Sequence, residues 1–329
     1  MSESTQVDVV GVGLNATDTL IFLPRYPRSG SKTEFHSASI LPGGQVATAV
    51  LACQRWQLRT RYVGKLGDDF AARIHREELA RAGVDACMLE VAHCASQQAF
   101  ILVDGKGERT VLWKRDEKLA LRSDDLRREW IVSARLLHVD GYDTEAAITA
   151  AGWAREAGIP VVADLDEPYP GIEDLLEKID YLIVSRDFPD RLLKEPDLKK
   201  SLPLLRVRFG CRFTAATLGT DGVLACDGEQ FHYASAYRVP VVDTTGAGDI
   251  FHAAFIYALL QGWPDGQQLD FACAAAGLNC MAAGARGGIR PIEDIRSLMA
   301  TGARYPAAWD VSRHGDAIPR QERRVRLVK

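Results

Sequence analysis

The sequence predicts an α/β fold in which a mostly parallel central sheet carries a second, smaller sheet. From about residue 124 onward, strand-like and helix-like segments alternate, as is typical of βαβ units. Between residues 16 and 41, and again between 95 and 115, strand-like segments follow one another without a long helix. A small sheet attached to a larger body explains these segments better than a parallel sheet does. At 329 residues the chain can form one large α/β unit.

Composition excludes several classes of function. Hydrophobic residues make up 47% of the chain and charged residues 26%, as in ordinary globular proteins. A net charge of -4 gives no support for nucleic-acid binding. No apolar run approaches the roughly 20 residues of a membrane helix, and the start MSESTQVDVV lacks signal-peptide features. Seven scattered cysteines without a C-x-x-C motif favour reduced thiols. We therefore expect a cytoplasmic protein without nucleic-acid or membrane partners.

The first strand, residues 7–13, is followed by a motif with an alternative interpretation. Gly11 to Ala16 matches the Gly-x-Gly-x-x-Ala dinucleotide fingerprint, and Glu34 lies near the distance expected for a ribose-binding acid. A nicotinamide oxidoreductase would need a helix directly after these glycines. Residues 18–24 are instead β-branched and aromatic and end at proline, which predicts another strand. We therefore disfavour the oxidoreductase.

Two glycine turns precede the next helices. Residues 33–40 resemble a short strand, and Pro42-Gly43-Gly44 then opens a helix that continues to about Trp56. Paired glycines at a helix start let a ligand approach the backbone, although a simple tight turn has the same signature. Residues 62–69 indicate a strand, a turn and an N-cap before a helix that ends near Gly83.

A hairpin completes the small sheet. Residues 97–103 and 108–113 are strand-like and are joined by Asp104-Gly105-Lys106-Gly107, a strong turn signal. We interpret this hairpin, with the strands of residues 16–41, as a lid. Lys114 and Arg115 beside it favour either a solvated pair of cations or an anionic acceptor such as a sulfonated or phosphorylated sugar.

The second half supplies the remaining elements of the body. We expect strands at 136–140, 159–163, 181–184 and 213–218, a hairpin at 223–233, and helices at 144–157, from 187, and at 247–261, 266–283 and 292–300. The strands end in polar positions: Asp140, Asp164, Ser185 and Thr217. Ligands of open α/β sheets bind outside this carboxyl edge.

Residues 241–249 read Val-Val-Asp-Thr-Thr-Gly-Ala-Gly-Asp. The two valines predict the end of a strand, and the apolar pattern after Gly248 predicts a helix. Free N–H groups and the positive end of the helix dipole make Gly246, Ala247 and Gly248 a candidate anion site. Asp249 beside it suits a base that accepts a hydroxyl proton during phosphoryl transfer.

The Gly-Gly helix start, the complete Asp-Thr-Thr-Gly-Ala-Gly-Asp run, the lid strands and Thr-Leu-Gly-x-x-Gly from Thr217 to Gly222 resemble the ribokinase (PfkB) family of sugar kinases. The resemblance covers residues 7–300. It implies a three-layer α/β/α sandwich with a β-lid, ATP and Mg²⁺ as cofactors, ATP-dependent phosphorylation of a sugar hydroxyl, and a homodimer formed through the lid.

The resemblance also implies roles for individual residues. The catalytic set is Gly246, Ala247, Gly248 and Asp249, with Asp249 as base, and the sugar-binding set is Asp18, Gly43, Gly44, Gln45, Arg109 and Asp140. The nucleotide-binding set is Ser185, Thr217, Gly219, Gly222 and Cys273. The monovalent-cation set is Asp243, Thr245, Gly284 and Gly288. The cation set applies because some members bind potassium beside the anion hole.

Several positions depart from the family pattern. Gln45 and Thr48 stand where the family often has asparagine, and Ser185 and Phe188 replace the asparagine and glutamate of a segment near the metal. Magnesium is then held either by Asp187 or by the phosphates alone. Ketohexokinase-like and sulfofructose-kinase-like branches tolerate such changes.

We therefore predict a carbohydrate kinase acting on a ketose-like or modified sugar, with a kinase domain over residues 1–304 and a basic tail over 305–329. The alternatives are a nucleoside kinase of the same fold and a non-catalytic sugar-binding sensor.

Overall fold

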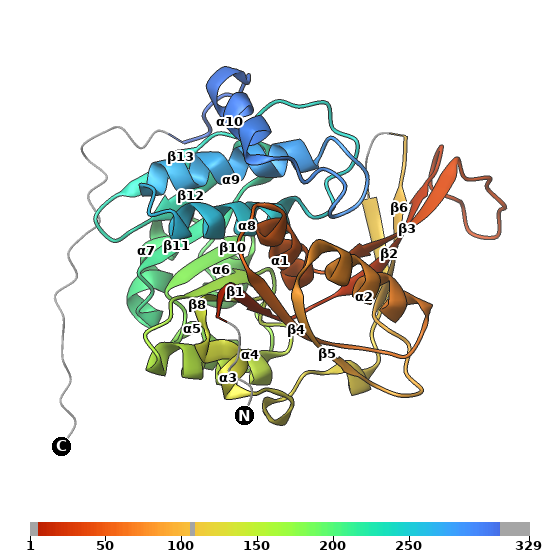
Figure 1. The fold of residues 1–329 in the computed structure, drawn as a ribbon. Helices are drawn as coiled ribbons and strands as arrows, with labels where there is room; N and C mark the ends of the chain where they lie inside the picture. The colour runs from red at the N-terminus through yellow and green to blue at the C-terminus, as the bar shows by residue number, and fades with distance from the viewer. Residues whose placement is uncertain (1–5, 106–108, 310–329) are drawn as a thin grey trace.

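The structure, a computed structural model, describes residues 6–105 and 109–309 (Figure 1). Its large sheet has the strand order β13-β12-β11-β10-β9-β8-β1-β4-β5. Neighbouring strands are parallel from β11 to β5, and β12 and β13 add an antiparallel edge. The mostly parallel sheet is therefore confirmed. Its strands are β1 (Val7–Val12), β4 (Thr60–Leu66), β5 (Asp85–Glu90), β8 (Ala134–Val139), β9 (Val161–Leu165), β10 (Tyr181–Ser185), β11 (Phe213–Thr217), β12 (Val223–Cys226) and β13 (Phe231–Ala234).

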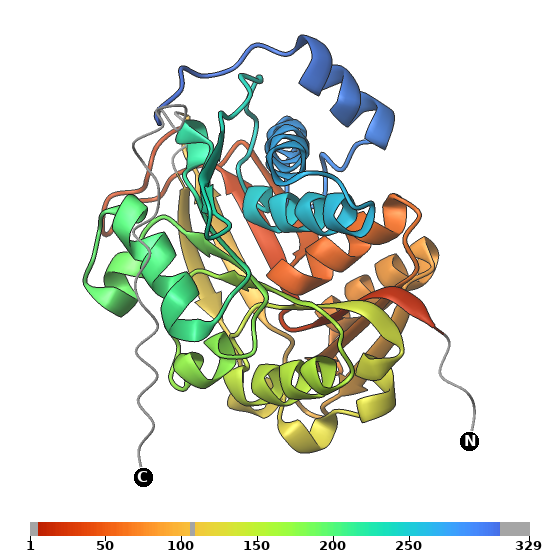
Figure 2. The ribbon, with the colours of Figure 1, turned by 90° about the vertical axis from the view of Figure 1, so that its left-hand side faces the viewer.

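Helices cover both faces of this sheet (Figure 2). One apolar core joins one face to α3 to α7, and a second core joins the other face to α1, α8, α9 and α10. Because both faces are covered, β1 is buried along its whole length, which explains its continuous valine-rich sequence. The helices are α1 (Gln45–Arg55), α2 (Phe70–Ala82), α3 (Arg128–Val132), α4 (Thr144–Glu156), α5 (Ile172–Leu176), α6 (Phe188–Leu193), α7 (Leu198–Phe209), α8 (Ala247–Leu260), α9 (Asp265–Asn279) and α10 (Ile292–Thr301).

The second sheet is the predicted lid, with strand order β3-β2-β6-β7. Its strands are β2 (Ala16–Phe22), β3 (Ser37–Gly43), β6 (Gln98–Val103) and β7 (Arg109–Lys114). β2 and β6 are parallel, and the other two pairs are antiparallel. Because side chains alternate along a strand, Asp18 and Leu20 of β2 share one face with Ala99 and Ile101 of β6. We call this the inner face of the lid.

Three sequence-based expectations differ from the structure. Val241 and Val242 form no strand; the Val242 N–H donates instead to the Cys280 carbonyl, 2.8 Å away, and both side chains are exposed. β3 begins at Ser37 rather than at residue 33, because its pairing with β2 starts there. β5 was not predicted, since an edge strand with half-buried side chains has a weak pattern.

The described part of the predicted tail lies against the body. Tyr305 N–H donates to the Ala236 carbonyl at 3.0 Å, and Ala308 N–H donates to the Tyr233 hydroxyl at 3.0 Å. The boundary after residue 304 stays a prediction, and residues 310–329, together with 106–108 of the hairpin turn, lie outside the described residues. Over the described ranges, no helix combines the length and the apolar character that a membrane span requires.

Candidate active site

The glycine run before α8 adopts the geometry of an anion site. Gly246 caps the helix with φ +76°, a conformation that glycine adopts without strain. A Cβ atom there would also overlap the backbone of Ala285. The first N–H groups of α8 have no partner within the helix, and Ala247 and Gly248 line an open cavity. The N-terminus of α8 can therefore hold an anion.

Asp249 lies in the first turn of α8, partly exposed. Burial of its carboxyl group raises its pKa to about 8, with help from the negative charges of Asp164 and Asp18, while His252 and Arg286 oppose the rise. The acids from β2, β9 and α8 are therefore close enough to interact electrostatically. A carboxylate of raised pKa beside an anion site can act as a general base near neutral pH.

His252, which the sequence reasoning did not select, lies one turn after Gly248. Its Nδ1 atom is 2.8 Å from the Gly248 carbonyl oxygen and 3.3 Å from Asp164 Oδ2, and its Nε2 atom is 3.4 Å from the Ile183 carbonyl oxygen. Burial lowers the pKa of His252, so the ring is neutral at pH 7. It links the first turn of α8 to the ends of β9 and β10. Only the i, i+4 spacing from Gly248 could have indicated this role.

The paired glycines lie against the acid of β2. Asp18 is buried, and burial raises its pKa to about 7, although the positive charge of Arg286 acts in the opposite direction. A Cβ atom on Gly43 would overlap the Asp18 carboxylate, and one on Gly44, which has φ +92°, would overlap the backbone of Asn15. Gln45 begins α1 directly after them. Glycine is thus required for the close approach of β2 to the start of α1.

Asp140 follows β8 and is only 1% exposed. Its Oδ2 atom accepts from the Leu14 N–H at 2.6 Å, and its Oδ1 atom accepts from the Tyr142 N–H at 3.1 Å. Burial raises its pKa to about 7. Both contacts anchor loops, so its expected contact with sugar stays a prediction.

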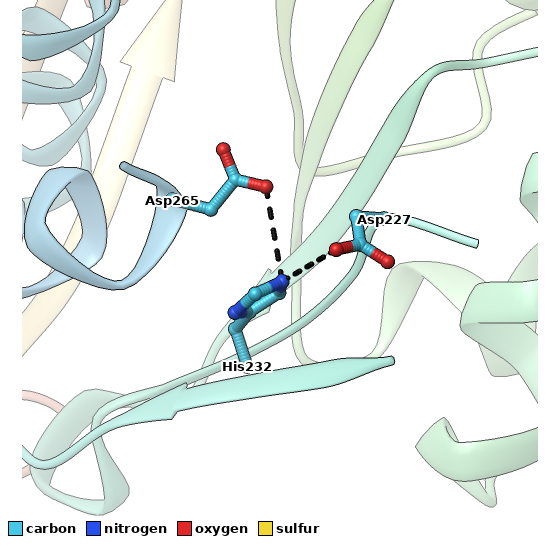
Figure 3. Close-up of side chains that lie close together, drawn as sticks. All are labelled: Asp227, His232 and Asp265. Carbon is cyan, nitrogen blue, oxygen red and sulfur yellow. Dashed lines mark hydrogen bonds and ion pairs between the residues drawn. The ribbon is translucent and has the colours of Figure 1, made fainter. Parts of the chain in front are cut away.

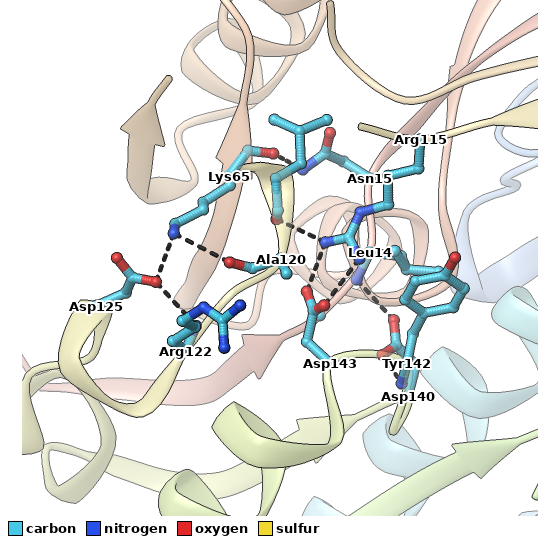
Figure 4. Close-up of polar contacts among 12 residues, drawn as sticks. Leu14, Asn15, Lys65, Arg115, Ala120, Arg122, Asp125, Asp140, Tyr142 and Asp143 are labelled. Atoms are coloured by element: carbon cyan, nitrogen blue, oxygen red, sulfur yellow. Dashed lines mark hydrogen bonds and ion pairs between the residues drawn. The ribbon is translucent and has the colours of Figure 1, made fainter. Parts of the chain in front are cut away.

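Arg115, directly after β7, and Lys65 of β4 are both paired with carboxylates (Figure 4). Arg115 donates to both oxygens of Asp143, at 2.8 and 2.6 Å, and lies 4.8 Å from the centre of the Tyr142 ring. Lys65 Nζ lies 2.5 Å from Asp125 Oδ2 and 3.0 Å from the Ala120 carbonyl oxygen. Both Arg115 and Asp143 are buried, with side-chain exposures of 11% and 9%. Arg115 is therefore neither a solvated cation nor a free anion receptor, whereas Lys114 is exposed, as expected for a solvated cation.

A cavity of about 430 Å³ lies beside the anion site. Most of the predicted nucleotide residues line it: Thr217, Gly219, Gly222 and Cys273, together with Ala247 and Gly248. Arg109 also lines this cavity, so its expected contact with sugar stays a prediction. Tyr305, beyond the predicted domain end, is a further lining residue. Ser185 lies elsewhere, and its hydroxyl donates to the Asp166 carbonyl oxygen at 3.2 Å.

For a divalent cation, the residues at the carboxyl edge offer few ligands. Asp166 is a half-buried carboxyl beside Ser185, and burial raises its pKa. Asp187 is exposed and lies 3.9 Å from Arg191. Such a site suits Mg²⁺, which binds through one or two carboxylates, phosphate oxygens and water.

A different group of metal-ligand side chains lies at the far end of α9. His232 Nε2 is 2.7 Å from Asp227 Oδ2 and 3.7 Å from Asp265 Oδ2 (Figure 3). Asp265 begins α9 and Asn279 ends it, so at 1.5 Å per residue the two ends of the helix are about 21 Å apart. Since the anion site lies near Asn279, this group cannot bind the metal of phosphoryl transfer.

Three residues of the predicted monovalent-cation set are joined by hydrogen bonds, and the fourth, Gly288, is bound to Asn279. Asp243 Oδ1 accepts from the Thr245 N–H at 2.9 Å and from its hydroxyl at 2.8 Å, and Asp243 Oδ2 accepts from the Gly284 N–H at 2.8 Å. The Gly288 N–H donates to Asn279 Oδ1 at 3.2 Å. In each of these contacts a side-chain oxygen accepts from an N–H or O–H group, so it is already occupied by a hydrogen-bond donor.

Residues 8–292 match the family model described as pfkB family carbohydrate kinase. A ribokinase of Staphylococcus aureus is 24% identical over 301 residues, which cover 88% of this chain and 99% of the relative. The crystal structure of a putative ribokinase from Agrobacterium tumefaciens superposes with a TM-score of 0.84 at 27% identity, covering 90% of this chain and 98% of that one. The structure of Arabidopsis thaliana ribokinase complexed with ribose and ATP has a TM-score of 0.77 at 24% identity, covering 90% and 100%, and shares the fold.

Proposed function

The chain belongs to the pfkB family of carbohydrate kinases, and we propose that it transfers the γ-phosphoryl group of ATP to a hydroxyl of a neutral sugar. The family makes it a sugar kinase; the choice of acceptor and the role of each residue are our proposal. The observation that carries it is the position of Asp249 in the first turn of α8, directly after Gly248 of the cavity and close enough to Asp18 of β2 for the charge of Asp18 to raise its pKa.

Asp249 is the base in this mechanism. Its carboxylate accepts the proton of the acceptor hydroxyl while the hydroxyl oxygen forms a bond to the γ-phosphorus, and the bond from that phosphorus to the bridging oxygen of ADP breaks. The N–H groups of residues 246–248 hold the charge of the transferring group. His252 keeps the first turn of α8 in place through its 2.8 Å contact with Gly248.

The nucleotide occupies the cavity lined by Thr217, Gly219 and Cys273. Its phosphates point toward Gly248, and Arg109 lies over the same space from the lid. Asp166 is the carboxylate of this chain that would hold Mg²⁺ together with phosphate oxygens; Asp187 is turned toward Arg191 instead. Bound Mg²⁺ supplies positive charge to the β- and γ-phosphates.

The charge of the acceptor side favours a neutral sugar. The negative charges of Asp164 and Asp18 both raise the pKa of Asp249, which supports placing the three carboxyl groups on this side. Arg115 and Lys65 are bound to Asp143 and Asp125, and Arg109 of the lid lines the nucleotide cavity. An acceptor phosphate or sulfonate would lie beside these carboxyl groups, and it would be repelled by each of them that is ionised, because like charges repel strongly in a partly buried site.

A nucleoside acceptor is the second candidate, because of an aromatic cluster at the lid. Trp113 of the inner face lies edge-on to Tyr142 at 6.2 Å, and Tyr142 lies 5.0 Å from Tyr169. Trp113 is also 58% exposed. Such rings can stack on a base or cover the apolar face of a sugar ring. A non-catalytic sensor has less support, since an intact base and anion site would serve no purpose in it.

The experiment that tests this function measures ADP release with Mg-ATP and a panel of hexoses, ketoses, pentoses, sugar phosphates, sulfonated sugars and nucleosides. A neutral sugar should increase ADP release far above the background hydrolysis. Release with nucleosides alone would transfer the assignment to the nucleoside kinase. No release with any acceptor, combined with tight binding of a sugar, would support the sensor.

We further propose that the lid forms a homodimer through its outer face. Three apolar side chains of one row across this face, Ile40, Phe100 and Leu112, are 45–56% exposed. Exposed apolar patches on a sheet often mark interfaces. Leu112→Glu should therefore yield a monomer in sedimentation velocity, whereas a wild-type protein that sediments as a monomer would exclude this dimer.

The proposal places the enzyme in the cytoplasm. All seven cysteines have free thiols, most of them buried, as is usual where thiols stay reduced. Fractionation of the host cell would test this location, and recovery outside the cytoplasm would contradict it.

A further inference from the structure

Two loops enclose the anion site. One comprises residues 243–249 and the other residues 284–288, and the backbone of Ala285 lies directly against Gly246. Family resemblance predicts a monovalent cation between such loops. A cation site needs several oxygen atoms whose lone pairs point into one space, without N–H donors in that space.

The position between the loops is held by a side-chain amide. Asn279, the last residue of α9, is fully buried. Its Nδ2 atom donates to the Thr245 carbonyl oxygen at 3.2 Å and to the Ala285 carbonyl oxygen at 3.1 Å, one from each loop. Its Oδ1 atom accepts from the Gly288 N–H. Two carbonyl groups that could face a cation therefore face an N–H₂ group, and the amide uses both ends to bind the loops together.

The acid of the predicted cation set is occupied as well. Asp243 is 4% exposed, and its two oxygens receive the Thr245 N–H, the Thr245 hydroxyl and the Gly284 N–H. The backbone N–H of Asp243 itself donates to the Cys280 carbonyl oxygen at 3.2 Å, directly after Asn279. The carboxylate thus closes the loops by hydrogen bonds, as a buried carboxylate requires.

The 284–288 loop also carries a positively charged side chain, Arg286. Arg286 is 4% exposed; its Nε donates to Thr48 Oγ1 at 3.0 Å and its Nη2 to the Gly43 carbonyl oxygen at 2.6 Å, and it forms an ion pair with Glu78. Thr48 is one of the positions where the family often has asparagine. The guanidinium group therefore brings a permanent positive charge between the 284–288 loop, α1 and the lid.

We propose that Asn279 is a positioning residue that holds the anion-hole loop where some members of the family use a monovalent cation, so that this enzyme works without potassium. The residues present do not fit the cation: the two carbonyls accept from Nδ2, the carboxylate accepts from three donors, and the nearby positive charge belongs to Arg286. The part of this inference that concerns turnover rests on the proposed function, whereas the part that concerns loop stability does not.

The first test compares the wild-type protein in KCl and in tetramethylammonium chloride at equal ionic strength. A cation that binds only the folded state raises the Tm, so we expect Tm values that agree within about one degree and turnover within about twofold in the two salts. A Tm that rises by several degrees in KCl, or turnover that rises about fivefold or more, would overturn the proposal. Absence of turnover in both salts would contradict the proposed function, and the Tm comparison would still decide the role of Asn279.

Variants of Asn279 make the test specific. Asn279→Asp keeps the shape but replaces both N–H donors by oxygen, and Asn279→Ala removes the amide. We expect about tenfold lower turnover for each in tetramethylammonium, and at least partial recovery of turnover and Tm in KCl, because the two carbonyls are then free for a cation. Gln268→Glu is the matched control: it alters a buried amide near the other end of α9, which donates to the Trp263 carbonyl oxygen.

The control should lower the Tm equally in both salts. If the Asn279 variants respond to KCl no more than Gln268→Glu does, the amide has only a structural role and the proposal is wrong.

Discussion

Asp249→Asn is the substitution with the most direct consequence for the mechanism. Asparagine keeps the size of the side chain and the start of α8, but it cannot accept the proton of the acceptor hydroxyl. It also removes a carboxyl group whose pKa is raised by the charge of Asp18. The fold and ATP binding should therefore persist while turnover falls.

The size of the effect follows from the raised pKa. A positioned base contributes about 10²- to 10⁴-fold to the rate, which corresponds to about 3–5 kcal/mol of barrier. With a pKa of about 8, about a tenth of Asp249 is ionised at pH 7 and about nine tenths at pH 9. The kcat/KM of the wild-type enzyme should therefore rise about tenfold between these pH values, and the loss in the variant should be about tenfold larger at pH 9.

The assay is coupled ADP release across pH 6–9.5 for both proteins, with ATP affinity measured separately by calorimetry. The variant should show a flat profile over this range. A variant within tenfold of the wild-type rate at pH 9, or one that keeps the wild-type rise with pH, would refute the role of Asp249 as base.

Two further predictions use the same site. Burial raises the pKa values of Asp18, Asp140 and Asp249 above the value of about 4 for an unfolded chain. The folded protein therefore binds more protons, and its free energy of unfolding should fall as pH rises from about 4 to 8, by up to about 1.4 kcal/mol per pH unit for each group. The Tm of the ligand-free protein should be lower at pH 8.5 than at pH 6, and this fall in Tm should be smaller in Asp249→Asn. A Tm that rises from pH 6 to pH 8.5 would contradict the prediction. Gly43→Ala would displace the Asp18 carboxylate and should raise the KM for sugar about tenfold or more, with little effect on the KM for ATP. Gly152→Ala is its control, because a Cβ atom at Gly152 meets open space. Equal KM values for sugar in the two variants would refute the contact between Asp18 and the sugar.

Features encoded by a few neighbouring residues could be predicted from the sequence. The α2 caps at Asp69 and Gly83 lie where expected, with the Asp69 side chain accepting from the Ala72 N–H. The glycine run before Asp249 likewise opens α8. Turn chemistry and capping act within one or two turns of chain, so their signal is local.

Features formed by residues distant in sequence could not be predicted. Arg286 and Thr48 are 238 positions apart, and the pairing of Arg115 with Asp143 spans 28. The sequence indicates that such cations exist but not which carboxylate binds them. The prediction of a strand at Val241 and Val242 was wrong for a related reason. β-branched residues favour a strand only where another strand offers a partner, and the Val242 N–H donates instead to the carbonyl of Cys280, at the end of α9.

The central claim concerns a sugar kinase whose acceptor side carries the carboxyl groups of Asp18, Asp164 and Asp249. The ratio of kcat/KM values for one ketose and for its phosphorylated form, measured with Mg-ATP at pH 8, tests it most directly. We expect the neutral ketose to be preferred by about 100-fold or more, since repulsion of a few kcal/mol at about 1.4 kcal/mol per tenfold acts on the anion. A preference for the phosphorylated or sulfonated sugar would contradict the account.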